Sequence, residues 1–166
     1  MVEYTPIGII RSGFTDKKNT PIQSIFVEDA MGEVEIFPEY VAGLKNIDRF
    51  SHIILIYHFH LSKNYSLFSK TCLEDEKHGI FAMRQSQRPN PIGISTVRLS
   101  RVMGNILSIS EVDVVDGSPL LDIKPFVPVF DNRRNATNGW LGQLHIHKVI
   151  KESVKRQKIL QTGNQK

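Results

Sequence analysis

Apolar and polar residues alternate in several short segments of the chain, which is the pattern of half-buried β-strands. This pattern and enrichment in β-branched residues predict strands at Tyr4–Arg11, Glu33–Phe37, Gly93–Val102, Ile106–Val115 and Leu120–Lys124. Met103-Gly104-Asn105 separates two of these strands and predicts a hairpin. An unbroken apolar run lies at the centre of Ser51–His60, so we expect a core strand that is buried on both faces.

Only two segments predict helices. Pro38–Leu44 carries a proline and an acid in its first turn. Gln143–Ile159 has apolar residues on one helical face and lysines and an arginine on the other. Asn64–His78 is polar and predicts a long loop. We therefore expect a mainly β, single-domain β-barrel at residues 1–140, with peripheral loops, and a basic C-terminal helix or tail at residues 141–166.

Composition and charge narrow the choice of partners only slightly. The chain has 166 residues, 40% of them hydrophobic, which suits one globular domain. A net charge of +4 is compatible with a nucleic-acid partner, although a solvated basic helix explains much of it. The single cysteine, Cys72, and the lack of an evident signal peptide favour a cytoplasmic protein. The longest apolar run, Ile53–Tyr57, is too short to cross a membrane.

The stretch Phe81–Leu99 has the densest grouping of residues that could bind a ligand. Arg84 and Arg88 precede Pro89-Asn90-Pro91, where the two prolines stiffen the turn and push Asn90 towards an extended conformation. Two guanidinium groups on a rigid loop that leads into a strand form a plausible clamp for an anion or a nucleotide. A proline-rich turn with solvated arginines explains the same residues, and the stretch alone does not separate the two interpretations.

Other kinds of site have weaker support. His58 and His60 would share a strand face, but His145 and His147 fall in a segment predicted helical, and no carboxylate completes a ligand triad. We therefore expect no metal. Cys72 and the serines lack a base at a recognisable spacing, and no glycine-rich nucleotide fingerprint is present. The turn at Asp116–Pro119 and the later Asp122 offer acceptors for hydroxyl or amino groups.

Two long motifs of the chain are the most specific, and they are Arg88-Pro89-Asn90-Pro91-Ile92-Gly93 and Asp116-Gly117-Ser118-Pro119-Leu120-Leu121-Asp122-Ile123-Lys124-Pro125. They are accompanied by Pro6-Ile7-Gly8, Thr20-Pro21-Ile22-Gln23, Phe37-Pro38-Glu39-Tyr40 and Phe50-Ser51-His52-Ile53. Together these motifs closely resemble the TrmO/TsaA-like family. The resemblance runs from Pro6 to about Asp131. The family commonly has arginine where Ile22 stands and threonine where Ser118 stands.

The resemblance implies a fold, a cofactor and a reaction. It implies a homodimeric β-barrel that binds S-adenosyl-L-methionine and N6-methylates an adenosine carrying a threonylcarbamoyl group at position 37 of a tRNA anticodon loop. By motif, the implied cofactor contacts are Pro21, Ile22, Gln23, Phe59, His60, Arg84, Ile94, Asp116, Gly117, Ser118 and Pro119. The two halves of a site would come from different subunits.

Methyl transfer to an adenine amine calls for further residues. The amine is a poor nucleophile, and an acceptor for its N–H would help it react. We expect Asn90, held between prolines, to be this acceptor, although a role in shaping the turn fits equally well. Arg88 and Lys124 are candidates for tRNA phosphate contacts.

Two alternatives from other classes are open at this level. One is a non-catalytic nucleotide- or RNA-binding β-barrel, in which the basic loop and helix hold RNA. The other is a metal-dependent β-barrel enzyme that uses His58 and His60.

Overall fold

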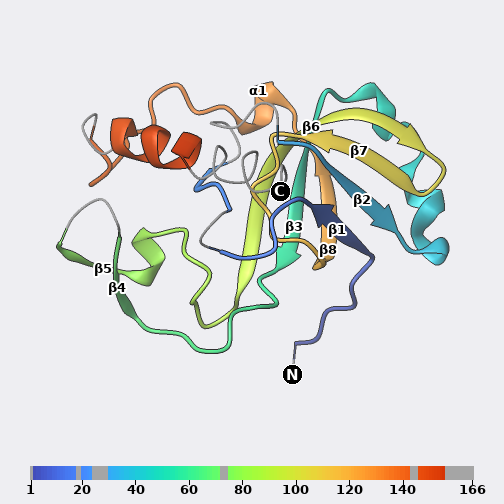
Figure 1. Cartoon of the computed structure of the whole chain (residues 1–166). Coiled ribbons are helices and arrows are strands. Elements are labelled where there is room, and N and C mark those ends of the chain that lie inside the picture. Colours follow the sequence, from blue (N-terminus) through green and yellow to red (C-terminus); the bar gives the residue numbers. More distant parts are fainter. Residues whose placement is uncertain (1, 18–19, 24–29, 72–74, 143–145, 156–166) are drawn as a thin grey trace, which may run out of the picture.

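The computed structural model of the chain describes residues 2–17, 20–23, 30–71, 75–142 and 146–155 (Figure 1). Six strands form a closed antiparallel barrel in the order β1-β2-β7-β6-β3-β8, and β8 pairs back onto β1. The strands are β1 (Gly8–Ser12), β2 (Gly32–Ile36), β3 (His52–His58), β6 (Ile92–Met103), β7 (Ile106–Ser110) and β8 (Ser118–Pro125). The prediction of a mainly β barrel is confirmed.

The barrel interior is filled by aliphatic side chains from every strand. Fully buried members include Ile10, Val34, Ile53, Leu55, Val97, Leu107, Ile109 and Leu120. Burying each such side chain stabilises the fold by about 1.5–3 kcal/mol relative to exposure. Along β3 the buried and half-buried residues alternate, so the prediction of burial on both faces is wrong. Ile54 and Ile56 point away from the interior of the barrel, because side chains on a strand alternate between its two faces.

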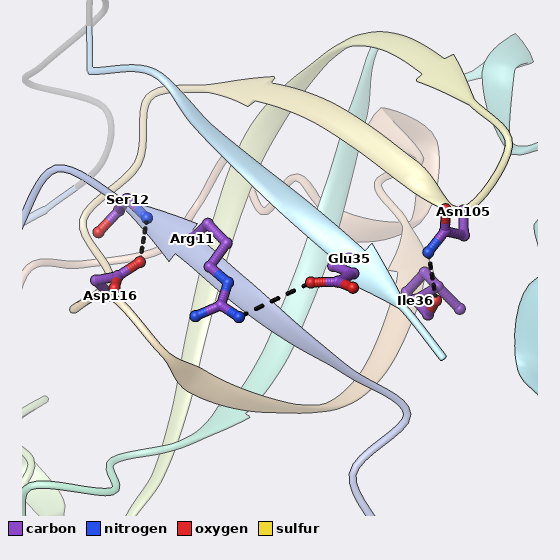
Figure 2. A network of polar contacts seen from close by, with 6 residues as sticks. All are labelled: Arg11, Ser12, Glu35, Ile36, Asn105 and Asp116. Atoms are coloured by element: carbon purple, nitrogen blue, oxygen red, sulfur yellow. Dashed lines mark hydrogen bonds and ion pairs between the residues drawn. The ribbon is translucent and has the colours of Figure 1, made fainter. Parts of the chain in front are cut away.

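The predicted hairpin is confirmed as β6–β7, and Gly104 takes a positive φ of 60° in its turn. The side-chain amide of Asn105 donates to the Ile36 carbonyl at 3.1 Å, which fastens this turn to the end of β2 (Figure 2). Strand β7 ends at Ser110 rather than at Val115, because Glu111 has a left-handed φ of 63° that ends the extended backbone. Val112 and Val114 stay buried beyond this break.

The shorter elements lie around the barrel. The predicted helix Pro38–Leu44 is confirmed as the 3-10 helix η2, which is followed by η3 (Ile47–Arg49). The segment predicted as a long loop holds β4 (Phe68–Lys70) and β5 (Lys77–Gly79), which pair with each other, so that prediction is wrong in part. The remaining short elements are η4 (Ile80–Ala82) and α1 (Pro128–Asp131).

The chain is helical again at residues 146–155, within the predicted C-terminal helix; residues 143–145 and 156–159 lie outside the described part. This helix and the β4–β5 pair lie together on one side of the barrel (Figure 1). Within the part of the chain that the structure describes, no helix combines the length and the apolar character that crossing a membrane requires.

Candidate functional site

A cleft of about 1220 Å³ lies where one end of the barrel meets these peripheral elements. The barrel contributes Tyr57 near the end of β3, Gly93 near the start of β6, and Ser118 at the start of β8. The connection from β7 to β8 also lines the cleft. The other walls come from η4 and the loop after it, the loop at residues 20–23, residues 138–141 and the C-terminal helix. Pockets for a single drug-sized ligand usually span about 300–1,000 Å³. The cleft is therefore larger than a typical pocket for one such ligand.

Tyr57 and Gly93 determine the shape of the cleft floor. They are direct partners in the β3–β6 ladder. A Cβ atom on residue 93 would lie 2.4 Å from the Tyr57 ring, so only glycine fits beneath this ring. Tyr57 is 4% exposed, and its hydroxyl lies 3.1 Å from the Ser95 hydroxyl. The Ser95 hydroxyl in turn donates to Asp113 Oδ1 at 2.5 Å.

The hydrogen bonds in this network have a defined direction. Because the Ser95 proton is donated to Asp113, the Tyr57 hydroxyl must be the donor to Ser95. Burial, followed by the nearby Asp113 charge, raises the pKa of Tyr57 well above its usual range, while the Ser95 hydrogen bond acts in the opposite direction. Tyr57 is therefore a neutral donor, and the chain of hydrogen bonds ends on the Asp113 carboxylate in the cleft.

His60 lines the barrel side of the cleft, beside Ser118 at the start of β8. Burial lowers its pKa first, the charges of His58 and Lys17 lower it further, and Asp116 opposes them. Ser118 Oγ lies 3.3 Å from His60 Nδ1 and donates its own proton to the Val115 carbonyl at 2.7 Å. The His60 Nδ1 must then be the donor of this pair, which leaves Nε2 as an acceptor on the neutral ring.

Asp116 supports this wall from behind. Its Oδ1 accepts the Ser12 N–H at 3.0 Å (Figure 2), and its own N–H donates to the Phe14 carbonyl. The N–H of Gly117 donates to the Ile10 carbonyl. Gly117 also has a φ of 75°, so the turn requires glycine at this position. The turn before β8 is thus fastened to β1.

Side chains far apart in sequence hold the opposite wall together. Arg84 Nη1 donates to Gln23 Oε1 at 3.1 Å, which links two loops of this wall. Arg88 Nη1 donates to the Met83 carbonyl at 2.8 Å, so this guanidinium helps to fold its own loop. The Trp140 indole N–H donates to the Ala82 carbonyl at 2.9 Å, and its ring stacks on His78 with centroids 4.1 Å apart.

The C-terminal helix completes the enclosure. Ser153 is fully buried, and its hydroxyl accepts the Ile22 N–H at 3.3 Å. Ile146 and Val149 of the same helix line the cleft. The helix therefore holds the loop at residues 20–23 in place.

The structure brings most of the sequence-predicted cofactor residues to this cleft. The predicted residues that line the cleft are Pro21, Ile22, Gln23, Phe59, His60, Arg84, Ile94 and Ser118. Asp116, Gly117 and Pro119 lie behind the lining, as their contacts with β1 explain. This placement is consistent with a cofactor role, which stays a prediction.

The other predicted site residues are placed differently. Arg88 lines the cleft, but Asn90 and Lys124 do not. The carbonyl of Asn90 accepts the Ile92 N–H at 2.8 Å, within the turn that leads into β6. The ammonium group of Lys124 lies 2.7 Å from the carboxylate of Asp122, so these two predicted contact residues pair with each other.

Sequence reasoning missed several residues of the cleft, among them Tyr57, Asp113 and Trp140. Tyr57 looked like part of an apolar core run, and Asp113 like the end of a strand. Gly93 was one usable signal, since a glycine at an inward position of a strand indicates a close neighbour.

Several cations and one carboxylate set the charge of the cleft. Lys17, Lys70, Arg84 and Arg88 line it, whereas Asp113 is the single acidic residue among its described lining residues. No group of three or more histidine, cysteine or acidic residues within the described ranges is arranged to hold a metal ion. His145 and Cys72 lie outside the described residues.

Comparison with known proteins adds independent evidence. The family model of the tRNA-methyltransferase O N-terminal domain matches residues 9–132. The chain is 55% identical to a Pyrococcus abyssi protein named "Probable S-adenosyl-L-methionine-binding protein", over 91% of this chain and 82% of that protein. It is 31% identical to the tRNA (adenine(37)-N6)-methyltransferase of Escherichia coli, over 83% of this chain and 63% of that enzyme.

A solved structure agrees with these matches. The crystal structure of TrmO from Pseudomonas aeruginosa superposes with a TM-score of 0.73 at 37% sequence identity, over 84% of this chain and 62% of that chain. The chain thus spans a little under two thirds of these two larger relatives. On the family match, the sequence identities and the shared barrel together, this chain belongs to the TrmO family.

Proposed function

We propose that this protein is an S-adenosyl-L-methionine-dependent methyltransferase that methylates N6 of an adenosine in tRNA. The observation that carries the proposal is the cleft, which gathers the residues of three separate sequence motifs at one end of the barrel. Relatives with this domain include the tRNA (adenine(37)-N6)-methyltransferase of Escherichia coli.

The residues of the cleft suit the cofactor. Pro21, Ile22, Phe59 and Ile94 offer an apolar surface for an adenine ring, and the volume of about 1220 Å³ leaves room for a second nucleoside. Arg84 suits the carboxylate of the cofactor's amino-acid part, since its guanidinium lines the cleft and is steadied by Gln23. The cofactor supplies an electrophilic methyl group on a sulfonium.

The chain's own residues then have to orient the reacting amine and keep water out. Holding two reactants in line supplies a large part of the rate enhancement in such displacements. The turn before β8 is fastened to β1, which keeps the barrel side of the cleft rigid. His60 offers Nε2 as a neutral acceptor for a hydroxyl or amino group of a ligand.

The substrate we propose is adenosine 37 with a threonylcarbamoyl group, in the anticodon loop. Bases in RNA loops can be splayed out and inserted into a pocket. Lys17, Arg84 and Arg88 give this cleft the positive charge that a tRNA backbone requires. We include in this proposal a cytoplasmic location, which suits a tRNA substrate.

We also propose that the active form is a homodimer. The outer face of β3 and β6 carries Ile54, Ile56, Ile92 and Ile94, and Ile94 is 59% exposed. This apolar face runs into the cleft, so a second copy packed on it would also border the site. Light scattering should give the mass of two chains, and Ile56→Lys should give the mass of one. A monomeric wild type would contradict this part of the proposal.

The first test is a calorimetric titration of the cofactor. Wild-type protein should bind S-adenosyl-L-methionine, and Arg84→Ala should weaken the affinity about tenfold, which corresponds to about 1.4 kcal/mol. Arg49→Ala is the matched control, because Arg49 is exposed on η3 and does not line the cleft. Folded wild-type protein that does not bind the cofactor would leave a non-catalytic RNA-binding barrel as the better interpretation.

The second test is methyl transfer. Radiolabelled methyl groups should enter tRNA that carries threonylcarbamoyladenosine at position 37, and mass spectrometry should place them on N6. A transcript with plain adenosine at this position tests whether the threonylcarbamoyl group is required. Labelling of both tRNAs at equal rates would contradict the narrower substrate and keep the broader activity.

A further inference from the structure

Asp113 is the carboxylate to which the hydrogen-bond network of the cleft floor leads. The network runs from Tyr57 inside the barrel through Ser95 to Asp113, which lies on the connection from β7 to β8. Both hydroxyl residues are only 4% exposed, whereas Asp113 is half-buried and lines the cleft. The network therefore connects a rigid interior to a group that a ligand can reach.

The hydrogen bonds give this carboxylate a fixed position. Ser95 donates to Oδ1 at 2.5 Å, a short distance typical of a hydrogen bond to an ionised acceptor. The Tyr57 ring that supports Ser95 lies against Gly93 and is buried in the barrel, so it cannot shift freely. Acceptors held in place before the reaction lose little free energy to reorganisation.

The surroundings of Asp113 define what it can bind. It is the single acidic residue among the described residues that line the cleft, and four cationic side chains share the lining. An anionic or phosphate-bearing part of a ligand is thus drawn to the cations, whereas a group with an N–H to donate is drawn to Asp113.

We propose that Asp113 is a catalytic residue that accepts the N6–H of the substrate adenosine and takes its proton during methyl transfer. As the bond between N6 and the methyl carbon forms, the bond between that carbon and the sulfonium sulfur breaks, and its electron pair stays on sulfur. The N6–H bond also breaks. Its electron pair returns to nitrogen, and its proton passes to the Asp113 carboxylate and then to water.

This assignment rests on the proposed function and revises one detail of the sequence analysis. The acceptor role predicted for Asn90 requires a residue in the cleft, and Asn90 does not line it. Ser95 and Tyr57 act through Asp113, so we assign them as positioning residues.

The test uses the full chain and single-turnover methylation of threonylcarbamoylated tRNA. Asp113→Asn keeps the shape of the side chain and an oxygen that can accept from Ser95, so the fold should survive. The methylation rate should fall by a factor of about 10²–10⁴, which is the range that general bases contribute. The dissociation constants for S-adenosyl-L-methionine and for tRNA should change less than twofold. Glu111→Gln is the control, since Glu111 pairs with Arg98 and does not line the cleft.

Testing the positioning residues Ser95 and Tyr57 requires a measurement that a loss of stability would not change. Ser95→Ala should lower the single-turnover rate by a smaller factor than Asp113→Asn, with both dissociation constants unchanged. Tyr57→Phe should lower it less again. A Ser95→Ala protein with the wild-type rate would contradict the relay while leaving Asp113 in place.

Other outcomes separate the competing explanations. If Asp113→Asn methylates at the wild-type rate, Asp113 is not the acceptor, although the proposed function stands. If it weakens cofactor binding as much as it lowers the rate, Asp113 holds the cofactor's ammonium group instead. If the wild type itself methylates no tRNA, the proposed function is wrong, and the role of Asp113 that depends on it is wrong as well.

Discussion

The barrel and the wall that faces it across the cleft are built by different kinds of interaction. The barrel is closed by backbone ladders between six strands and filled with aliphatic side chains. The facing wall, which we call the rim, consists of residues 20–23, 61–71, 75–88, 138–142 and the helix at 146–155. Single side chains hold much of the rim, such as Trp140 on the Ala82 carbonyl and Gln85 on the Lys70 carbonyl.

This difference has a consequence for function. A region with cooperative ladders and a continuous core opens only when the whole domain unfolds, whereas a region held by separate contacts can open locally at lower free energy. The barrel therefore fixes the positions of Asp113 and Ser118, and the rim is the part that can adjust when a large ligand such as tRNA enters.

The largest effect should come from a cavity in the barrel. Leu55 is fully buried, so Leu55→Ala should lower the free energy of unfolding by about 2–5 kcal/mol. Leu67 in the rim is 54% exposed, and Leu67→Ala should change it by about 0.5 kcal/mol or less. Urea denaturation measures both. Similar losses for the two variants would mean that the rim shares the barrel's core.

The next effect concerns the close approach of Gly93 and Tyr57. Gly93→Ala would place a methyl group 2.4 Å from the ring, and the shift that relieves this clash should cost about 1–3 kcal/mol. Gly43→Ala is the control, because no atom lies within 4 Å of its Cβ position, and it should change the free energy of unfolding by less than about 0.5 kcal/mol. A Gly93→Ala protein as stable as wild type would show that the tyrosine can move aside.

A smaller effect should appear in the rim alone. Trp140→Phe removes the indole N–H that donates to Ala82, a hydrogen bond worth about 0.5–1.5 kcal/mol. Hydrogen exchange should become faster at the amides of Ile80 and Met83 while the amides of β3 stay unchanged. His78→Ala is the matched variant, because it removes the stacked ring and keeps the indole hydrogen bond. Faster exchange throughout the barrel would contradict the separation of the two regions.

The smallest effect is the pH dependence that His60 contributes. Its pKa is lowered in the folded protein, chiefly by burial, so the unfolded chain binds the proton more readily. The contribution of His60 to the free energy of unfolding is fully present above the unfolded pKa of 6.5, and it is lost as the pH falls through the lower folded pKa. Denaturation curves between pH 5 and pH 8 should show a smaller acid loss for His60→Gln than for wild type. His52→Gln, outside the cleft, serves as the control, and identical curves for all three proteins would contradict the assignment.

The sequence by itself determined the fold class and most of the strands. Alternation in β2 and at the start of β6 and the glycine turn between β6 and β7 are local signals, and local signals suffice for antiparallel neighbours joined by a short turn. The motif residues were also readable, because each motif is short and continuous in the chain. Their resemblance to one family predicted which loops belong together before any geometry was available.

Only the tertiary structure decided which face of β3 is buried, where β7 ends and which residue stands at the cleft floor. An apolar run has no period that separates the inside of a barrel from its outside, so Ile54 and Leu55 look alike in sequence. The hydrogen bond from Ser95 to Asp113 joins residues 18 positions apart, and the one from Trp140 to Ala82 joins residues 58 apart. Such contacts form only when the chain has folded, because no local pattern in the sequence specifies the distance between their partners.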